Sequence, residues 1–132
     1  MKEEKYLLDT HSLFFWIIKE EISFDFIDFL DRQSKNGKVL ISSVSFWEIA
    51  LLKKRGRIDI EDIYRWTDDI LSYSPAKIIE PTISDMIDST LLPDYHKDPF
   101  DRLLVAQAKN NHAILVTRDR LIPRYSIGTL WM

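Results

Sequence analysis

The sequence predicts a single α/β domain over residues 1–132, in which a central parallel sheet has helices on both faces. Three observations support this three-layer fold class. Short apolar segments alternate with longer segments of helical periodicity, as in sheets built from right-handed crossover units. No repeat, low-complexity segment or linker interrupts the chain. Hydrophobic residues make up 45% and charged residues 30% of the sequence, a composition typical of globular domains.

In the first half of the chain, apolar spacing and helix-terminating residues define the elements. Thr10 is the expected N-cap of the first helix, Asn36-Gly37 ends the second and Gly56 ends the third. The apolar centre of the second strand is typical of a strand buried on both faces. The expected order is strand 5–8, helix 11–20, helix 26–31, strand 38–42, helix 45–54 and helix 60–72.

The second half continues the alternation. Ser84 is expected to begin a short helix that Leu92-Pro93 ends. Asp98-Pro99 opens the next helix, because Asp suits the N-cap and proline suits the first helical position. The expected order is strand 77–80, helix 84–91, helix 100–110, strand 113–117 and an edge strand within 125–130.

Composition excludes several classes of protein. The absence of cysteine excludes disulfides and thiolate zinc sites and suits a cytoplasmic location. Three scattered glycines do not form a nucleotide-binding loop. The longest apolar run, Leu13 to Ile18, is six residues, whereas a membrane span needs about 20. With 18 basic and 21 acidic residues, the net charge is −3, so binding of nucleic acid would depend on local geometry.

Four carboxylates are expected at one edge of the sheet. Asp9 ends the first strand, Glu48 lies in the first turn after the second strand, Asp101 begins the helix after Pro99, and Asp119 follows the strand 113–117. Parallel strands place their carboxyl ends together, which is where such sheets bind ligands. Carboxylates within about 4–6 Å of one another raise each other's pKa unless a cation lies between them. All-oxygen ligands favour Mg²⁺ or Mn²⁺.

Each acid also has a simpler structural interpretation. Glu48 stands three residues after Ser45, as in a capping box, and Asp101 stands three after Asp98, where an acid complements the helix dipole. Asp9 suits a turn and Asp119 suits a solvated loop. We prefer Asp101 to Asp98 as the metal ligand, because a residue before proline favours the extended N-cap conformation.

Four segments together resemble the successive motifs of the PIN-domain family, and in particular the VapC-type ribonuclease toxins of bacterial toxin-antitoxin pairs. These segments are LLDTH at 7–11, SSVSFWEIA at 42–50, HKDPFDRLLVAQA at 96–108 and LVTRD at 115–119. The resemblance implies a PIN-like fold, Mg²⁺- or Mn²⁺-dependent RNA cleavage, a homodimer and a small antitoxin that blocks the site. It also implies that Asp9, Glu48 and Asp101 are the core acids and that Asp119 completes the metal site.

Other residues near this edge have supporting roles in the hypothesis. Thr117 is a candidate to contact the substrate or an acid, and Asp98 to support the metal site. The three histidines show no metal-pair spacing, and His96 and His112 are expected in loops. Candidate substrate-binding residues are Lys53, Lys54, Arg55, Arg57, Arg102, Arg118 and His11, with Arg120 also flanking an acid. The dense basic run 53–57 is equally typical of a solvated helix end.

Two other functions use the same residues. A metal-dependent DNA nuclease or phosphatase would need the same acids, although Asp9-Thr10-His11 lacks the second acid of an Asp-x-Asp phosphatase motif. A noncatalytic RNA-binding or partner-binding module would be expected to have lost one acid, and all four are present. The sequence therefore favours a metal-dependent ribonuclease.

Overall fold

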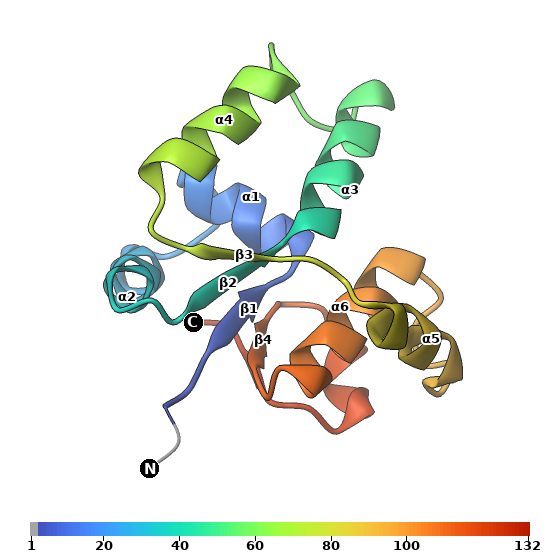
Figure 1. Ribbon diagram of the computed structural model, residues 1–132. Helices are drawn as coiled ribbons and strands as arrows, with labels where there is room; N and C mark the ends of the chain where they lie inside the picture. The colour runs from blue at the N-terminus through green and yellow to red at the C-terminus, as the bar shows by residue number, and fades with distance from the viewer. Residues whose placement is uncertain (1–2) are drawn as a thin grey trace.

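The computed structural model describes residues 3–132, and the first two residues of the expected domain lie outside this range. The described residues form five strands, six α-helices and one 3₁₀ helix (Figure 1). Their order is β1 Tyr6–Leu8, α1 Thr10–Ile18, α2 Phe24–Lys35, β2 Val39–Ser42, α3 Ser43–Lys54, α4 Ile63–Tyr73, β3 Lys77–Ile79, α5 Ile83–Leu91, α6 Pro99–Asn110, β4 Ile114–Val116, η1 Ile122–Tyr125 and β5 Thr129–Leu130.

The sheet has the strand order β3-β2-β1-β4-β5, and every pair of neighbouring strands is parallel. The first strand lies at the centre, with Leu8 in register with Ile41 on one side and Val116 on the other. The expected parallel sheet with helices on both faces is confirmed. Because all strands point the same way, the residues that follow β1, β2 and β4 emerge at one edge.

Alternate residues of the central strands enter two separate hydrophobic clusters. Leu8 and Ile41 pack on the face covered by α1, α2 and α4, whereas Leu7, Leu40 and Leu115 pack on the face covered by α6. Figure 1 shows α5 beside α6 on this second side. Burial on both faces explains why the strands are apolar throughout.

The N-caps of three helices differ from the sequence prediction. Asp9, Ser42 and Thr82 are the N-caps of α1, α3 and α5, in place of the expected Thr10, Ser45 and Ser84. In each case the cap keeps an extended backbone while its side chain accepts a backbone N–H. The capping residue is therefore the last one before the chain turns into the helix. The predicted Ser45–Glu48 capping box is wrong, because both residues lie inside α3.

Other boundaries shift by a few residues. Helix α2 extends the predicted 26–31 segment in both directions, because Ser23 caps it. Helix α4 begins at Ile63, after the Asp62 N-cap, rather than at residue 60. The predicted edge segment 125–130 contains the two-residue strand β5, which pairs with β4. Asp98 caps α6 with Pro99 in the first turn, as predicted. Among the described residues, no helix is long and apolar enough to span a membrane.

Replacing Phe26 tests the packing of α2 against the sheet. Phe26 is fully buried and packs edge-on against Trp131, with ring centroids 5.0 Å apart. Phe26→Ala should lower the free energy of unfolding in urea by about 3–5 kcal/mol, because it removes buried surface and leaves a cavity. Phe24→Ala on the same helix is the control, since Phe24 is 90% exposed, and should change stability by less than about 0.5 kcal/mol. Equal effects of the two substitutions would contradict this packing.

Candidate active site

The four predicted acids converge at the carboxyl edge of the sheet. Asp9 follows β1, Glu48 lies in α3 after β2, Asp101 lies in the first turn of α6, and Asp119 follows β4. Burial raises the pKa of Asp101, and the charges of Asp98, Asp9, Glu48 and Asp119 raise it further. The topology therefore brings together acids that are up to 110 positions apart in the sequence.

Asp9 is fixed by backbone contacts on both sides. Its carboxylate Oδ1 accepts the Ser12 N–H at 2.8 Å, and its own N–H donates to the Val116 carbonyl oxygen at 3.0 Å. The Ser12 hydroxyl donates to the same carbonyl at 2.9 Å. One residue later, the Thr10 hydroxyl donates to the Ser45 hydroxyl at 3.1 Å, which joins α1 to α3. Asp9 is thus both the N-cap of α1 and a buried acid.

Glu48 is buried in α3, and only 8% of its surface is exposed. Burial raises the pKa of Glu48, and the negative charges of Asp98 and Asp9 add to this effect, while Thr10 and His11 oppose it. Within residues 3–132, its buried Oε1 atom has no hydrogen-bond partner. A buried carboxylate oxygen without a donor is unfavourable, so this atom is suited to bind a cation or a water molecule.

Asp98 and Asp101 have different surroundings. The Asp98 Oδ1 atom accepts the N–H groups of Phe100 at 2.8 Å and Asp101 at 3.3 Å, and so caps α6. Burial, followed by the charges of Asp98, Asp9, Glu48 and Asp119, raises the pKa of Asp101 to about 8. Asp98 therefore stabilises the start of α6, while the ionised form of Asp101 is disfavoured by its burial and by the neighbouring negative charges.

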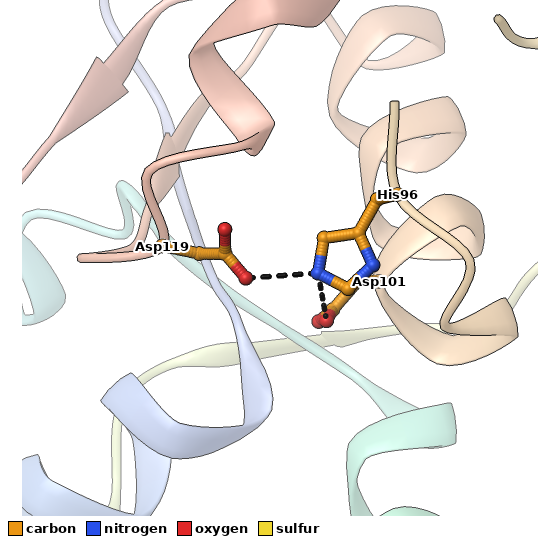
Figure 2. A group of neighbouring side chains, drawn as sticks. All are labelled: His96, Asp101 and Asp119. Atoms are coloured by element: carbon orange, nitrogen blue, oxygen red, sulfur yellow. Dashed lines mark hydrogen bonds and ion pairs between the residues drawn. The ribbon is translucent and has the colours of Figure 1, made fainter. Parts of the chain in front are cut away.

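His96 belongs to the cluster, although from the sequence we expected it only as a loop residue. Its Nε2 atom lies 2.8 Å from Asp119 Oδ2 and 3.1 Å from Asp101 Oδ2 (Figure 2). Its Nδ1 atom accepts the Asp98 N–H at 3.1 Å, so the ring proton is on Nε2 and faces the acids. The His96 backbone N–H donates to the Tyr125 hydroxyl at 2.8 Å. Two sequence signals concern it: its position two residues before the α6 N-cap and its place as the first residue of the 96–108 motif.

Asp119 is the most accessible acid of the set, with 31% of its side chain exposed. Partial burial raises its pKa, but hydrogen bonds from the Leu121 N–H and from His96 outweigh this, and the net pKa is lowered. The buried Thr117 hydroxyl accepts the Asp119 N–H at 3.0 Å. Thr117 thus holds the Asp119 backbone in the loop after β4.

The donor set fits a hard divalent cation. Ligand atoms of His96, Asp101 and Asp119 lie within 4.8 Å of one another. The carboxylate oxygens, including the unpartnered Glu48 Oε1, suit Mg²⁺ or Mn²⁺. The His96 Nε2 proton faces the acids and would have to leave before this nitrogen became a ligand. The residues therefore fit an oxygen-bound cation better than a zinc ion.

The predicted substrate-binding residues of the first half of the chain lie at the end of α3 and at the start of α1. Lys53 and Lys54 lie in the last turn of α3, and the exposed Arg55 and Arg57 follow it. All four follow Glu48 in the sequence by at least five residues. His11 is exposed at the start of α1, and its charge lowers the pKa of Glu48.

Arg102 and Arg118 make contacts that limit a substrate role. The Arg102 guanidinium donates to the carbonyls of Ser89, Leu92, Pro93 and His96. It therefore fastens the loop before α6, and the structure does not support it as a phosphate ligand. Arg118 lies 4.6 Å from the Phe15 ring centre and 3.6 Å from Glu21 Oε1, with 48% of its side chain exposed. The neighbouring Arg120 is exposed.

This fold and cluster of acids define a class of protein. The PIN-domain family model matches residues 6–128, so the chain belongs to the PIN-domain family. The family resemblance of the four sequence motifs is confirmed. No curated protein sequence matches the chain.

Solved structures show the same fold at low sequence identity. A DNA-bound VapBC structure from Salmonella typhimurium has a TM-score of 0.71 and 16% identity, covering 97% of this chain and 98% of that chain. VapBC2 from Rickettsia felis, bound to a promoter DNA fragment, has a TM-score of 0.71 and 19% identity, covering 96% and 98%. FitAcB from Neisseria gonorrhoeae has a TM-score of 0.69 and 15% identity, covering 95% and 96%.

Metal-free protein should lose stability as the pH rises. The pKa of Asp101 is raised from 3.8 to about 8, so the folded chain holds this proton more tightly than the unfolded chain. Its contribution is present below the unfolded pKa and is lost as the pH rises through about 8. In a chelator, the urea midpoint should fall between pH 5 and 8 by more in the wild type than in Asp101→Asn. Adding Mg²⁺ at the upper pH should restore wild-type stability; parallel pH profiles would count against this.

Proposed function

We propose that the chain is a metal-dependent endoribonuclease and the toxin of a toxin-antitoxin pair. The observation that best supports this proposal is that Asp9, Glu48, Asp101 and Asp119 lie near one another at one edge of a PIN-domain sheet. The pKa values of Glu48 and Asp101 are raised, and the buried Glu48 Oε1 has no hydrogen-bond partner among the described residues. A cation site explains these features better than a purely structural role of the acids.

In this proposal Asp9, Glu48, Asp101 and Asp119 hold Mg²⁺ or Mn²⁺. The bound cation would offset negative charge developing on the phosphodiester and make a nearby water more acidic. The chain holds the acids in fixed positions: Asp9 through the α1 cap, and Asp101 through the Asp98 cap of α6. His96 directs its Nε2 proton toward Asp119 and Asp101, which reduces their repulsion before the cation arrives. Lys53, Lys54, Arg55 and Arg57 are proposed phosphate contacts.

The toxin role is supported by the family and by likeness to the structures named VapBC and FitAcB. A further structure with this fold is a toxin-antitoxin complex from Klebsiella pneumoniae, which supports a small antitoxin as a partner. A homodimer is proposed by the same resemblance. The exposed apolar residues of α5, including Ile83, Ile87 and Leu91, offer one surface for such contacts.

A DNA nuclease is the second candidate, because the acids themselves do not distinguish RNA from DNA. A noncatalytic binding module is less well supported, because all four acids are present and are close enough to act on one another's charge. The choice between these candidates depends on the substrate that is cleaved.

Cleavage of RNA should require both the metal and Asp101. Purified wild-type protein should cleave single-stranded RNA with Mg²⁺ and should lose this activity in a chelator. The Asp101→Asn variant should be at least about 100-fold less active, because a cation ligand is removed. Asp68→Asn, an exposed acid of α4, is the matched control and should be fully active. Cleavage that survives chelation and the Asp101 substitution would refute the metal site, and cleavage of DNA alone would favour the second candidate.

Expression of the toxin alone should arrest growth of a bacterial host, because RNA cleavage stops protein synthesis. The Asp101→Asn variant should allow growth at equal protein levels, and co-expression of a small protein encoded beside the gene should relieve the arrest. Growth curves with immunoblots of protein level provide the measurement. Normal growth with confirmed wild-type expression would count against the toxin role while leaving the nuclease proposal intact.

A further inference from the structure

Trp47 is an exposed aromatic residue that is a neighbour in sequence of one acid of the carboxylate cluster. It lies in α3 immediately before the buried Glu48, yet 62% of its surface is exposed. Single exposed apolar residues are ordinary on protein surfaces, so exposure alone does not assign a role. The surroundings of this tryptophan add three further observations.

The first observation is that the indole is held in place. Trp47 packs against Phe100 at 75°, with ring centroids 5.0 Å apart. Phe100 is half-buried in the first turn of α6 and immediately precedes Asp101. Each of the two aromatic residues therefore stands one position before an acid of the cluster. Edge-to-face contacts of this kind favour a defined ring orientation, and more than half of the indole surface still faces solvent.

The second observation is the charge pattern of α3. Lys54 stands seven residues after Trp47, so the two side chains share a helix face, about 10 Å apart along the axis. Lys54 is exposed, and the exposed Arg55 follows it. The third observation is that Trp47 and its packing partner Phe100 each precede an acid of the cluster, Glu48 and Asp101. Near these acids a negatively charged group without a cation would be repelled. An uncharged aromatic group suits the indole, and phosphates suit the basic end of the helix.

We propose that Trp47, braced by Phe100, is a stacking platform for one unpaired nucleobase next to the scissile phosphate. The inference rests on the nuclease function proposed above and narrows its substrate to single-stranded nucleic acid. A base has an aromatic face and no charge, so it stacks on an indole beside carboxylates while its phosphates lie toward Lys54. Bases inside a duplex are already stacked and do not offer a free face.

The test compares Trp47→Ala and Trp47→Phe with Phe24→Ala, an exposed aromatic control on α2. Cleavage of a short single-stranded RNA with Mg²⁺ is measured for each full-length variant. Trp47→Ala should raise KM about 5- to 150-fold, the range expected for loss of one stacked base. Trp47→Phe should recover most of the loss, because a ring is retained. Phe24→Ala should leave KM unchanged.

A second arm removes the base instead of the side chain. A series of the same RNA with one abasic position should contain one position at which base removal raises KM for the wild type and has no further effect in Trp47→Ala. This arm still tests the proposal in the wild type if Trp47→Ala fails to fold, since an abasic series without a sensitive position overturns it. The urea midpoint and the elution volume of each variant are measured in parallel.

The outcomes separate the two proposals. If the wild type cleaves RNA and KM is the same in Trp47→Ala, only the stacking platform is overturned. If Trp47→Ala changes the oligomeric state, the indole is covered by a second copy and the platform is overturned. If the wild type neither binds nor cleaves RNA, the proposed function fails and this inference fails with it.

Discussion

Mutual repulsion among the carboxylates at the carboxyl edge of the sheet is the constraint that the local structure has to accommodate. The parallel topology places Asp9, Glu48 and Asp119 near Asp101. Burial, the charge of Asp98 and the charges of these three acids raise the Asp101 pKa to about 8. Like charges that are buried close together destabilise the folded state. The site persists because the acids belong to elements fixed by buried strands and capped helices, whose hydrophobic packing supplies the stabilising free energy.

The hydrogen bonds that cap α1 and α6 also fix the positions of acids in the candidate site. The Asp9 carboxylate accepts a backbone N–H of α1, and the Asp98 carboxylate accepts two at the start of α6. The partial positive charge of these helix N-termini lies toward the cluster and offsets part of its negative charge. His96 adds a proton donor between Asp119 and Asp101. The capping interpretation and the metal interpretation of these acids are therefore compatible.

Much of the fold could be predicted because its signals are local. The apolar strands and the Asp98-Pro99 helix start follow from spacing and from backbone preference, and the structure has them within a few residues. The N-caps of α1 and α3 could not be chosen in the same way. Asp9 and Thr10 both suit a cap, as do Ser42 and Ser45, and the choice depends on where the strand ends in the sheet.

The candidate acids and the alternation of strands and helices could be identified from the sequence, because residue type and periodicity are properties of the chain. Which groups meet depends on the packing of the folded chain. His96 faces Asp101 and Asp119 because Tyr125 and the α6 N-cap hold it there, and Arg102 turns to the carbonyls of a loop. Trp47 meets Phe100 across two helices that are distant in sequence. Contacts between distant segments depend on the packed sheet and helices, and no local pattern encodes them.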